Sequence, residues 1–312
     1  MTTPTVSVVI PTYRRRGYLI EALGSVVGQT YADFEAIVGN DSGAEYIEPV
    51  KAKFGDERIR WVDHPTRKGM CGNILDGFGR ARGRFVATLH DDDRWDSRFL
   101  EALVPRLEQD RTLSVAFCDH HVIDEHGDVD GELSDAFTSG TGRARLRRGV
   151  QRPIYELAVV DNGLAMNVAA VFRRDRLGLP TFPRQAGTSY DLWLSREMAR
   201  GGAGAWYEPT RLAFYRQHPD SQMSARTLEN ARANIYLYQR FLADPELDVV
   251  PRKALRRLLA RHRYTLAVGL IRTGHPRTAR TQLMRALATG GSPRVGLALA
   301  ATFLPAHVGR RL

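Results

Sequence analysis

The sequence predicts an α/β protein with a mainly parallel central sheet flanked by helices, followed by a C-terminal helical appendage. In the first 127 residues, short β-rich runs alternate with helical stretches, and this alternation builds parallel sheets through right-handed crossovers. The middle of the chain is less regular, and after Thr227 the pattern is helical almost without interruption. We therefore expect one domain over residues 1–226 and a basic helical region over residues 227–312.

Each expected element rests on the spacing of its apolar residues. Short apolar or β-branched runs predict strands, and apolar residues three or four positions apart predict helices. The expected strands are Val6–Ile10, which Pro11 stops, Phe34–Val38, Arg58–Val62, Phe85–Leu89 and Leu113–Cys118. The expected helices are Tyr18–Gly28, Gly72–Ala81, Arg98–Glu108, Leu228–Leu242, Pro251–Thr273 and His275–Leu287, with Gly274 and Gly290 as stops.

Composition excludes several classes of protein. The chain has 312 residues, of which 43% are apolar and 26% charged, as in ordinary globular domains. Cys71 and Cys118 are far apart and have no metal-like spacing, which argues against a zinc site or a disulfide frame. The start has no signal-peptide pattern, and the apolar run Val295–Leu304 is too short to cross a bilayer, which needs about 20 residues. We expect a cytoplasmic protein.

The positive charge is concentrated in the last part of the chain. The net charge is +10, but residues 251–312 contain 13 Lys or Arg and no Asp or Glu. A basic helix can dock on an anionic membrane or pack on the catalytic domain with a solvated basic face, and both readings stay open. The expected helix has one apolar side, formed by Leu255, Leu258, Leu259, Leu266 and Leu270. No nucleic-acid motif accompanies the charge, so nucleic acid is not an expected partner.

The strongest single feature is an acidic triplet, Asp91–Asp93, directly after an apolar strand. Like charges this close repel, and Mg²⁺ or Mn²⁺ would neutralise them with the hard oxygen ligands that these ions prefer. If the segment stays extended, Asp91 and Asp93 point to one side and Asp92 to the other. The alternative is an Asp-rich turn that solvates its charges.

Polar residues also follow the other expected strands, where ligands of open parallel sheets bind. Tyr13 can stack on a base, Asp41 can accept a hydrogen bond from a base or ribose, and the residues after the third strand can contact phosphate, although each can also be a turn residue. Asp191 precedes an apolar helical stretch and can be a simple N-cap. The sequence lacks both the P-loop pattern and the serine-hydrolase elbow.

Taken together, these segments resemble the family 2 glycosyltransferases of the GT-A fold. The resemblance covers about residues 5–224 and rests on Val6–Tyr13, Gln29–Glu35, Asn40–Asp41, the acidic strand end and Tyr190–Trp193. It implies transfer of a hexosyl or deoxyhexosyl group from a nucleotide-diphosphate donor, with inversion and with the help of Mg²⁺ or Mn²⁺. A UDP- or dTDP-sugar donor is expected, with a glycan, lipid-linked or small-molecule acceptor.

The resemblance also assigns roles to individual residues. Asp191 matches the catalytic base, and Arg216 lies in a segment that can contact the donor diphosphate. The expected nucleotide site comprises Pro11, Thr12, Tyr13, Arg15, Asp41, Lys68, Asn73 and Asp91, and the expected metal ligands are Asp92, Asp93 and His218.

The motifs depart from the family pattern in two places. Alignment on Trp95 puts His90 at the first acid of the usual acidic motif and Asp92 at the metal-binding one, whereas strand alternation favours Asp91 with Asp93. Asn40 stands where the family often has an acid, which we expect to alter base or ribose preference.

Two other functions remain as alternatives. A sugar nucleotidyltransferase should carry a Gly-rich basic loop after the first strand, and this chain has Pro11 and Thr12 there instead. A non-catalytic nucleotide-binding scaffold would use the acidic cluster without turnover. The favoured prediction is a cytoplasmic transferase in surface-glycan, lipid-linked saccharide or glycoconjugate synthesis, with peripheral contact with the inner face of the membrane left open as one of the two alternatives for the basic helices.

Overall fold

The chain divides into two compact units in a computed structural model. The structure describes residues 3–164, 168–218, 227–247 and 252–302. One unit is formed by Met1–Phe182 with Leu194–His218, and the other by Pro183–Trp193 with Pro219–Leu312. The first unit contains every described strand.

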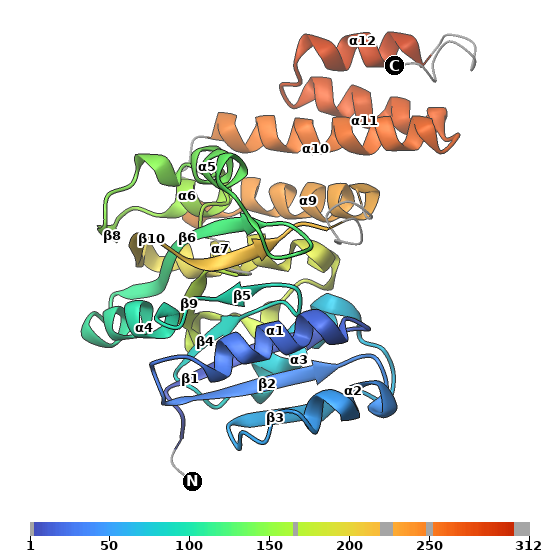
Figure 1. Ribbon diagram of the computed structural model, residues 1–312. Coiled ribbons are helices and arrows are strands. Elements are labelled where there is room, and N and C mark those ends of the chain that lie inside the picture. Colours follow the sequence, from blue (N-terminus) through green and yellow to red (C-terminus); the bar gives the residue numbers. More distant parts are fainter. Residues whose placement is uncertain (1–2, 165–167, 219–226, 248–251, 303–312) are drawn as a thin grey trace. The chain divides into compact units, whose positions relative to one another are not determined.

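The first unit is built on one ten-stranded sheet (Figure 1). Its main strand order is β3-β2-β1-β4-β9-β6-β10-β5, with β7 paired to β6 and β8 paired to β10. The strands are β1 (Val6–Thr12), β2 (Phe34–Asn40), β3 (Ile59–Asp63), β4 (Phe85–Thr88), β5 (Arg94–Trp95), β6 (Leu113–Ile123), β7 (Val129–Asp130), β8 (Gly149–Gln151), β9 (Ala170–Arg173) and β10 (Gly204–Arg216).

Strands β1 to β4 are parallel, and the rest of the sheet is mixed. Val6 of β1 pairs with Phe34 of β2 on one side and with Phe85 of β4 on the other. Strand β9 runs antiparallel between β4 and β6, while β6 and β10 are parallel to each other. The carboxyl ends of β1, β2 and β4 therefore meet at one edge of the sheet. The expected α/β class with a central sheet flanked by helices is confirmed.

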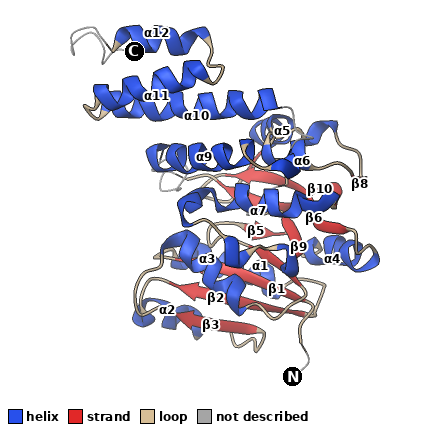
Figure 2. Cartoon of the chain, turned by 180° about the vertical axis from the view of Figure 1, so that it is seen from behind, coloured by secondary structure: helices blue, strands red, loops and turns tan. Residues whose placement is uncertain are grey.

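Helices cover both faces of this sheet (Figure 2). Side chains alternate along a strand, so Val8 and Val9 of β1 point to opposite faces of the sheet. Val8 belongs to the core that contains Leu23 of α1. Val9 lies so close to α3 that a Cβ added to Gly77 would be 2.4 Å from Cγ1 of Val9. The α-helices of this unit are α1 (Arg16–Val27), α2 (Ala44–Lys51), α3 (Gly69–Arg80), α4 (Phe99–Gln109), α5 (Gly131–Gly140), α6 (Tyr155–Val159) and all but the first turn of α7 (Tyr190–Ala199). The 3-10 helices of the described chain are η1 (Arg143–Arg145), η2 (Arg174–Arg176), η3 (Leu179–Thr181), η4 (Arg184–Ser189), η5 (Arg200–Gly202) and η6 (Pro245–Leu247).

The second unit is helical. It contains η4, the start of α7, α9 (Thr227–Leu242), α10 (Arg252–Arg272), α11 (Pro276–Ala288) and α12 (Pro293–Ala301). Its core includes Ala267 and Leu270 of α10, Leu283 of α11 and Val295 of α12. Within the described ranges, no helix is both long and apolar enough to cross a membrane.

The apolar side of α10 is packed inside the protein. Leu255, Leu259, Leu266 and Leu270 are all buried. These four leucines are therefore not available for membrane docking, whereas Leu258 is half-buried, and packing of the helix on the catalytic domain stays a prediction. The exposed large apolar side chains of the second unit lie on the following helices instead, at Met284 and Leu287 of α11 and Leu297 of α12.

The expected strands and helices are confirmed, with shifted ends. Strand β6 continues beyond Cys118 to Ile123 because His120 is buried in the sheet and not solvated in a loop. The sequence patterns did not predict α2, β9 or β10. Each of these elements is short or interrupted by polar and Pro residues, such as Pro49 inside α2.

Candidate active site

The acidic triplet forms a turn at the edge where β1, β2 and β4 end. Strand β4 ends at Thr88, and the N–H of Asp93 donates to the carbonyl of His90 at 3.2 Å. Because the segment is not extended, strand alternation does not apply to it, and Asp91 and Asp93 do not form the pair that alternation suggested. The turn instead gathers His90, Asp92 and Asp93.

Asp91 is tied to the end of β1. Its Oδ2 accepts a hydrogen bond from Thr12 Oγ1 at 2.8 Å and another from the N–H of Tyr13 at 3.2 Å, and Arg15 Nη1 lies 3.4 Å from its Oδ1. Burial, together with the neighbouring Asp92, raises the pKa of Asp91 to about 7. The carboxyl group therefore fixes the loop that carries Tyr13 and Arg15 against the acidic turn.

Asp92 carries the negative charge of the cluster. Its Oδ2 contacts Arg15 Nη1 and lies 3.1 Å from Nε2 of His218. Burial alone would raise the pKa of Asp92, but the hydrogen bond with His218 and the positive charge near it lower the pKa instead. The structure thus brings together three predicted site residues, Arg15, Asp92 and His218, that are up to 203 positions apart in the sequence.

Asp93 is the most deeply buried member of the cluster. Its Oδ1 accepts the backbone N–H of Arg216 at 2.8 Å, whereas its Oδ2 has no hydrogen-bond partner among the described residues. His90 Nδ1 is 4.0 Å from that oxygen. Burial and the charge of Asp92 raise the pKa of Asp93 well above its usual range. A buried carboxyl oxygen without a partner is costly unless something occupies it.

These donors fit a divalent cation. One ligand atom each from His90, Asp92 and Asp93 lie within 4.8 Å of one another. Carboxylate oxygens suit Mg²⁺ and Mn²⁺, and Mn²⁺ also accepts imidazole nitrogen. The unpartnered Oδ2 of Asp93 is a free ligand position, and a positive charge would relieve the repulsion that raises its pKa. Sequence reasoning assigned no metal role to His90, although its place beside the acids was a signal.

Arg216 holds the cluster in place. The side chain is 1% exposed, and its Nε donates to the carbonyl of Asp92 at 2.8 Å. Its Nη1 donates to the carbonyls of Asp124 and Glu125, and its Nη2 pairs with Glu21 Oε2 at 2.6 Å. Most of its N–H groups are thus engaged within the protein, and a contact with a diphosphate stays a prediction.

The predicted base-binding residues lie beside the cluster. Tyr13 is partly exposed, and the guanidinium of Arg67 lies 3.8 Å from the centre of its ring. The N–H of Asp41 donates to the carbonyl of Thr12 at 3.0 Å, so Asp41 is adjacent to the end of β1. Pro11 and Thr12 are buried within β1 itself. Tyr13, which is predicted to stack on the base, and Asp41, which is predicted to bind it, are therefore on neighbouring strand ends.

Two predicted nucleotide contacts have protein partners instead. Asn73 is 2% exposed, its Nδ2 donates to the carbonyl of Gly39 at 2.7 Å, and a Cβ on Gly39 would lie 1.8 Å from its Oδ1. The ammonium of Lys68 pairs with Asp76. The structure therefore places Asn73 between α3 and β2, and it directs Lys68 along α3.

Asp191 lies in the first turn of α7 and belongs to the second unit. Within that unit, its charge adds to the effect of burial in raising the pKa of Tyr238 in α9, so the two side chains are near each other. Thr188 Oγ1, in the segment before α7, hydrogen bonds with Asn230 Oδ1 of α9. The segment that carries Asp191 is thus packed on the C-terminal helices.

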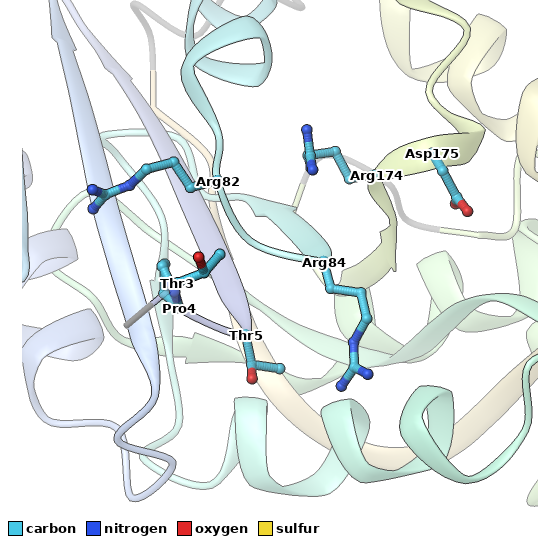
Figure 3. A pocket seen from close by; sticks show the side chains of 7 residues that line it. All are labelled: Thr3, Pro4, Thr5, Arg82, Arg84, Arg174 and Asp175. Carbon is cyan, nitrogen blue, oxygen red and sulfur yellow. The ribbon is translucent and has the colours of Figure 1, made fainter. Parts of the chain in front are cut away.

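A basic pocket lies at the other edge of the sheet, near the amino ends of β1 and β4 (Figure 3). Arg82, Arg84 and Arg174 contribute to its lining, and their guanidinium groups point in different directions. Arg82 pairs with Glu35, and Arg84 pairs with Glu108. Ligands of parallel sheets bind at carboxyl ends, so this pocket is not the nucleotide site.

The sequence model of one family, "Glycosyl transferase family 2", matches residues 7–151. These residues include the ends of β1, β2 and β4 and the whole acidic turn. Residues 7–151 therefore carry the sequence pattern of glycosyltransferase family 2.

Curated relatives agree with this match. The UDP-Glc:alpha-D-GlcNAc-diphosphoundecaprenol beta-1,3-glucosyltransferase WfgD of Escherichia coli is 25% identical over 190 residues, which are 61% of this chain and 68% of that protein. The chain spans only 26–38% of the length of three further curated relatives.

Two solved structures share the fold. Staphylococcus aureus TarS 1–349 in complex with UDP-GlcNAc superposes with a TM-score of 0.65 at 14% identity, covering 98% of this chain and 87% of that one. The mannosyltransferase PcManGT of Pyrobaculum calidifontis, in complex with GDP-Man and Mn²⁺, gives a TM-score of 0.59 at 19% identity, covering 100% of this chain and 84% of that one. At these identities the likeness establishes the fold, and the glycosyltransferase fold extends beyond the residues that the family model matches.

Proposed function

We propose that this glycosyltransferase moves a hexosyl or deoxyhexosyl group, with inversion, from a UDP- or dTDP-sugar to an acceptor hydroxyl. The observation that carries the proposal is the acidic turn Asp91–Asp93 beside Tyr13 and Asp41 at the carboxyl edge of the sheet. This arrangement offers a cation site and a base site next to each other, as a nucleotide diphosphate requires. WfgD is named for a UDP-Glc donor and TarS was solved with UDP-GlcNAc, which favours UDP, whereas PcManGT was solved with GDP-Man.

The protein's own residues have distinct parts in this reaction. Asp92 and Asp93, with His90 or His218, would hold Mg²⁺ or Mn²⁺, which supplies positive charge to the departing diphosphate. Arg15 already lies against Asp91 and Asp92, so its guanidinium adds a second cation at the same place.

Asp191 takes the proton from the acceptor hydroxyl as its oxygen attacks the sugar. A single displacement inverts the anomeric centre and requires no second nucleophilic carboxylate. General-base catalysis of this kind contributes roughly 10²- to 10⁴-fold in rate.

The proposed acceptor is a lipid-linked or surface-glycan saccharide. Support comes from WfgD, which is named as a glucosyltransferase acting on alpha-D-GlcNAc-diphosphoundecaprenol. Helices α10 to α12 contain basic residues and no acidic ones, and α11 exposes Met284 and Leu287 at 54% and 40%. We propose that these helices contact the anionic inner face of the membrane that holds such an acceptor.

The first experiment incubates the protein with UDP-glucose, UDP-GlcNAc and a dTDP-sugar in the presence of Mn²⁺. Release of nucleoside diphosphate supports a glycosyltransferase, whereas release of pyrophosphate would indicate a nucleotidyltransferase and binding without turnover a scaffold.

The second experiment tests the base. Asp191→Asn should keep donor affinity and lose roughly 10²- to 10⁴-fold in transfer rate, because only proton removal is affected. Asp128→Asn, which changes an exposed acid in the turn after β6, is the matched control and should transfer normally. Full activity of Asp191→Asn would remove this residue from the mechanism.

A further inference from the structure

His64 lies between two carboxylates beneath the proposed base site. Its Nδ1 is 2.8 Å from Asp41 Oδ1, and its Nε2 is 3.2 Å from Asp76 Oδ2. The side chains of His64 and Asp41 are each 2% exposed. The three residues come from the loop after β3, the end of β2 and the middle of α3, so the imidazole joins three elements.

Only one form of the ring satisfies both contacts. A neutral imidazole donates from one nitrogen and accepts at the other, and an ionised carboxylate only accepts. A neutral His64 would therefore direct a lone pair at a carboxylate oxygen on one side. The imidazolium donates on both sides, and the two carboxylates compensate its charge in a buried place.

The same contacts determine which hydrogen-bond acceptor position of the Asp41 carboxylate is left for a ligand. Its Oδ1 faces His64 and accepts the N–H of Lys68 at 3.2 Å, and its Oδ2 accepts the N–H of Gly69 at 2.8 Å. A carboxylate has about four acceptor positions. Three of them are filled by the ring and by the start of α3, so one position is left on Oδ2. Asp41 itself is joined to the end of β1, where Tyr13 begins the base stack.

We propose that His64 is a positioning residue for nucleobase recognition. The protonated ring holds the Asp41 carboxylate in one orientation and leaves its last acceptor position for an N–H of the base. Asp76 in turn holds the ring, and Lys68 and Arg80 pair with Asp76 from the solvent side. This inference rests on the proposed function, since it needs a nucleotide at this edge of the sheet.

The test measures the affinity of UDP, dTDP and GDP by calorimetry in the presence of Mn²⁺, for wild type and His64→Gln. A glutamine cannot donate to both carboxylates, and we expect the dissociation constant of the best-bound nucleotide to rise about tenfold, as when a charge-assisted hydrogen bond is partly lost. Turnover at saturating donor should stay within about twofold, because the base is held alike in the ground and transition states.

The split between affinity and turnover separates positioning from a purely structural role, because damage to the fold would lower both. Arg80→Ala is the matched control, because it removes the ion pair of Arg80 with Asp76 and leaves His64 in contact with both carboxylates. It should bind like wild type. Asp76→Asn provides a second variant if His64→Gln fails to fold, and it should weaken binding severalfold with turnover at saturating donor unchanged.

Each result has one meaning. A His64→Gln or Asp76→Asn protein that binds nucleotide within twofold of wild type, or whose turnover at saturating donor falls as much as its affinity, overturns the role of His64 while leaving the proposed function intact. Wild-type protein that binds none of the three nucleotides overturns the proposed function and this inference with it.

Discussion

Replacing Asp93 with asparagine should separate the stability of the fold from cation binding. The ligand atoms of Asp92 and Asp93 lie within 4.8 Å of each other. At that distance and an effective dielectric constant of about 20, two ionised carboxylates repel by roughly 3 kcal/mol. Asparagine keeps an oxygen for the N–H of Arg216 and carries no charge, so the repulsion disappears.

The direction of the effect with pH follows from the shift of the Asp93 pKa. The fold raises this pKa, so the group favours folding while it is protonated and loses that contribution as the pH rises through the folded value. Without metal, Asp93→Asn should therefore match wild type at low pH and exceed it by up to about 3 kcal/mol at high pH, or several degrees in melting temperature.

Thermal unfolding with EDTA and with added Mn²⁺ measures both effects. Wild type should be stabilised by Mn²⁺, and Asp93→Asn should lose most of that stabilisation, because the cation lacks one charged ligand. Asp128→Asn should respond to Mn²⁺ as wild type does. A variant that is less stable than wild type in EDTA at high pH, or that keeps the full response to Mn²⁺, would refute the reasoning.

Two further predictions concern other parts of the chain. Burial, together with the guanidinium of Arg143, whose Nη1 lies 3.2 Å from Nδ1 of His120, lowers the pKa of His120 to about 3. Wild type should therefore lose about 2 kcal/mol of folding stability between pH 7 and pH 5 from this group alone. His120→Gln should make that decline in stability shallower. Equal slopes of unfolding free energy against pH in the two proteins would contradict this account. At low salt the protein should float with liposomes that contain anionic lipid, and it should stay at the bottom of the gradient when the liposomes are neutral. Replacing Met284 and Leu287 with aspartate should abolish flotation. Equal flotation of the variant would show that these helices are not the contact.

The first half of the fold could be predicted because its signals are local. Strand β1 and helix α1 are fixed by apolar spacing, and the order of strands and helices sets the parallel pairing of β1 to β4. The acidic turn could be located because it follows β4 directly. These inferences need only neighbours within a few residues.

The parts that sequence reasoning missed depend on contacts between distant segments. Arg216 donates to Asp93 across 123 positions, and nothing near either residue signals the bond. Nothing in the sequence singled out His64, because both of its carboxylate partners belong to other elements. From the sequence alone, Asn73 could equally be a polar residue in an exposed loop, so its burial against Gly39 could not be predicted.

The way the chain is shared between its two units has a practical consequence for anyone who shortens it. Residues 183–193, including the proposed base Asp191, cluster with the C-terminal helices, and Thr188 bonds to Asn230. A protein truncated before α9 would retain the strand ends of the proposed nucleotide site, but residues 183–193 would lose the helices against which they pack. Such a fragment is suited to measuring donor affinity, and an absence of transfer in it would say nothing about the chemistry of the intact enzyme.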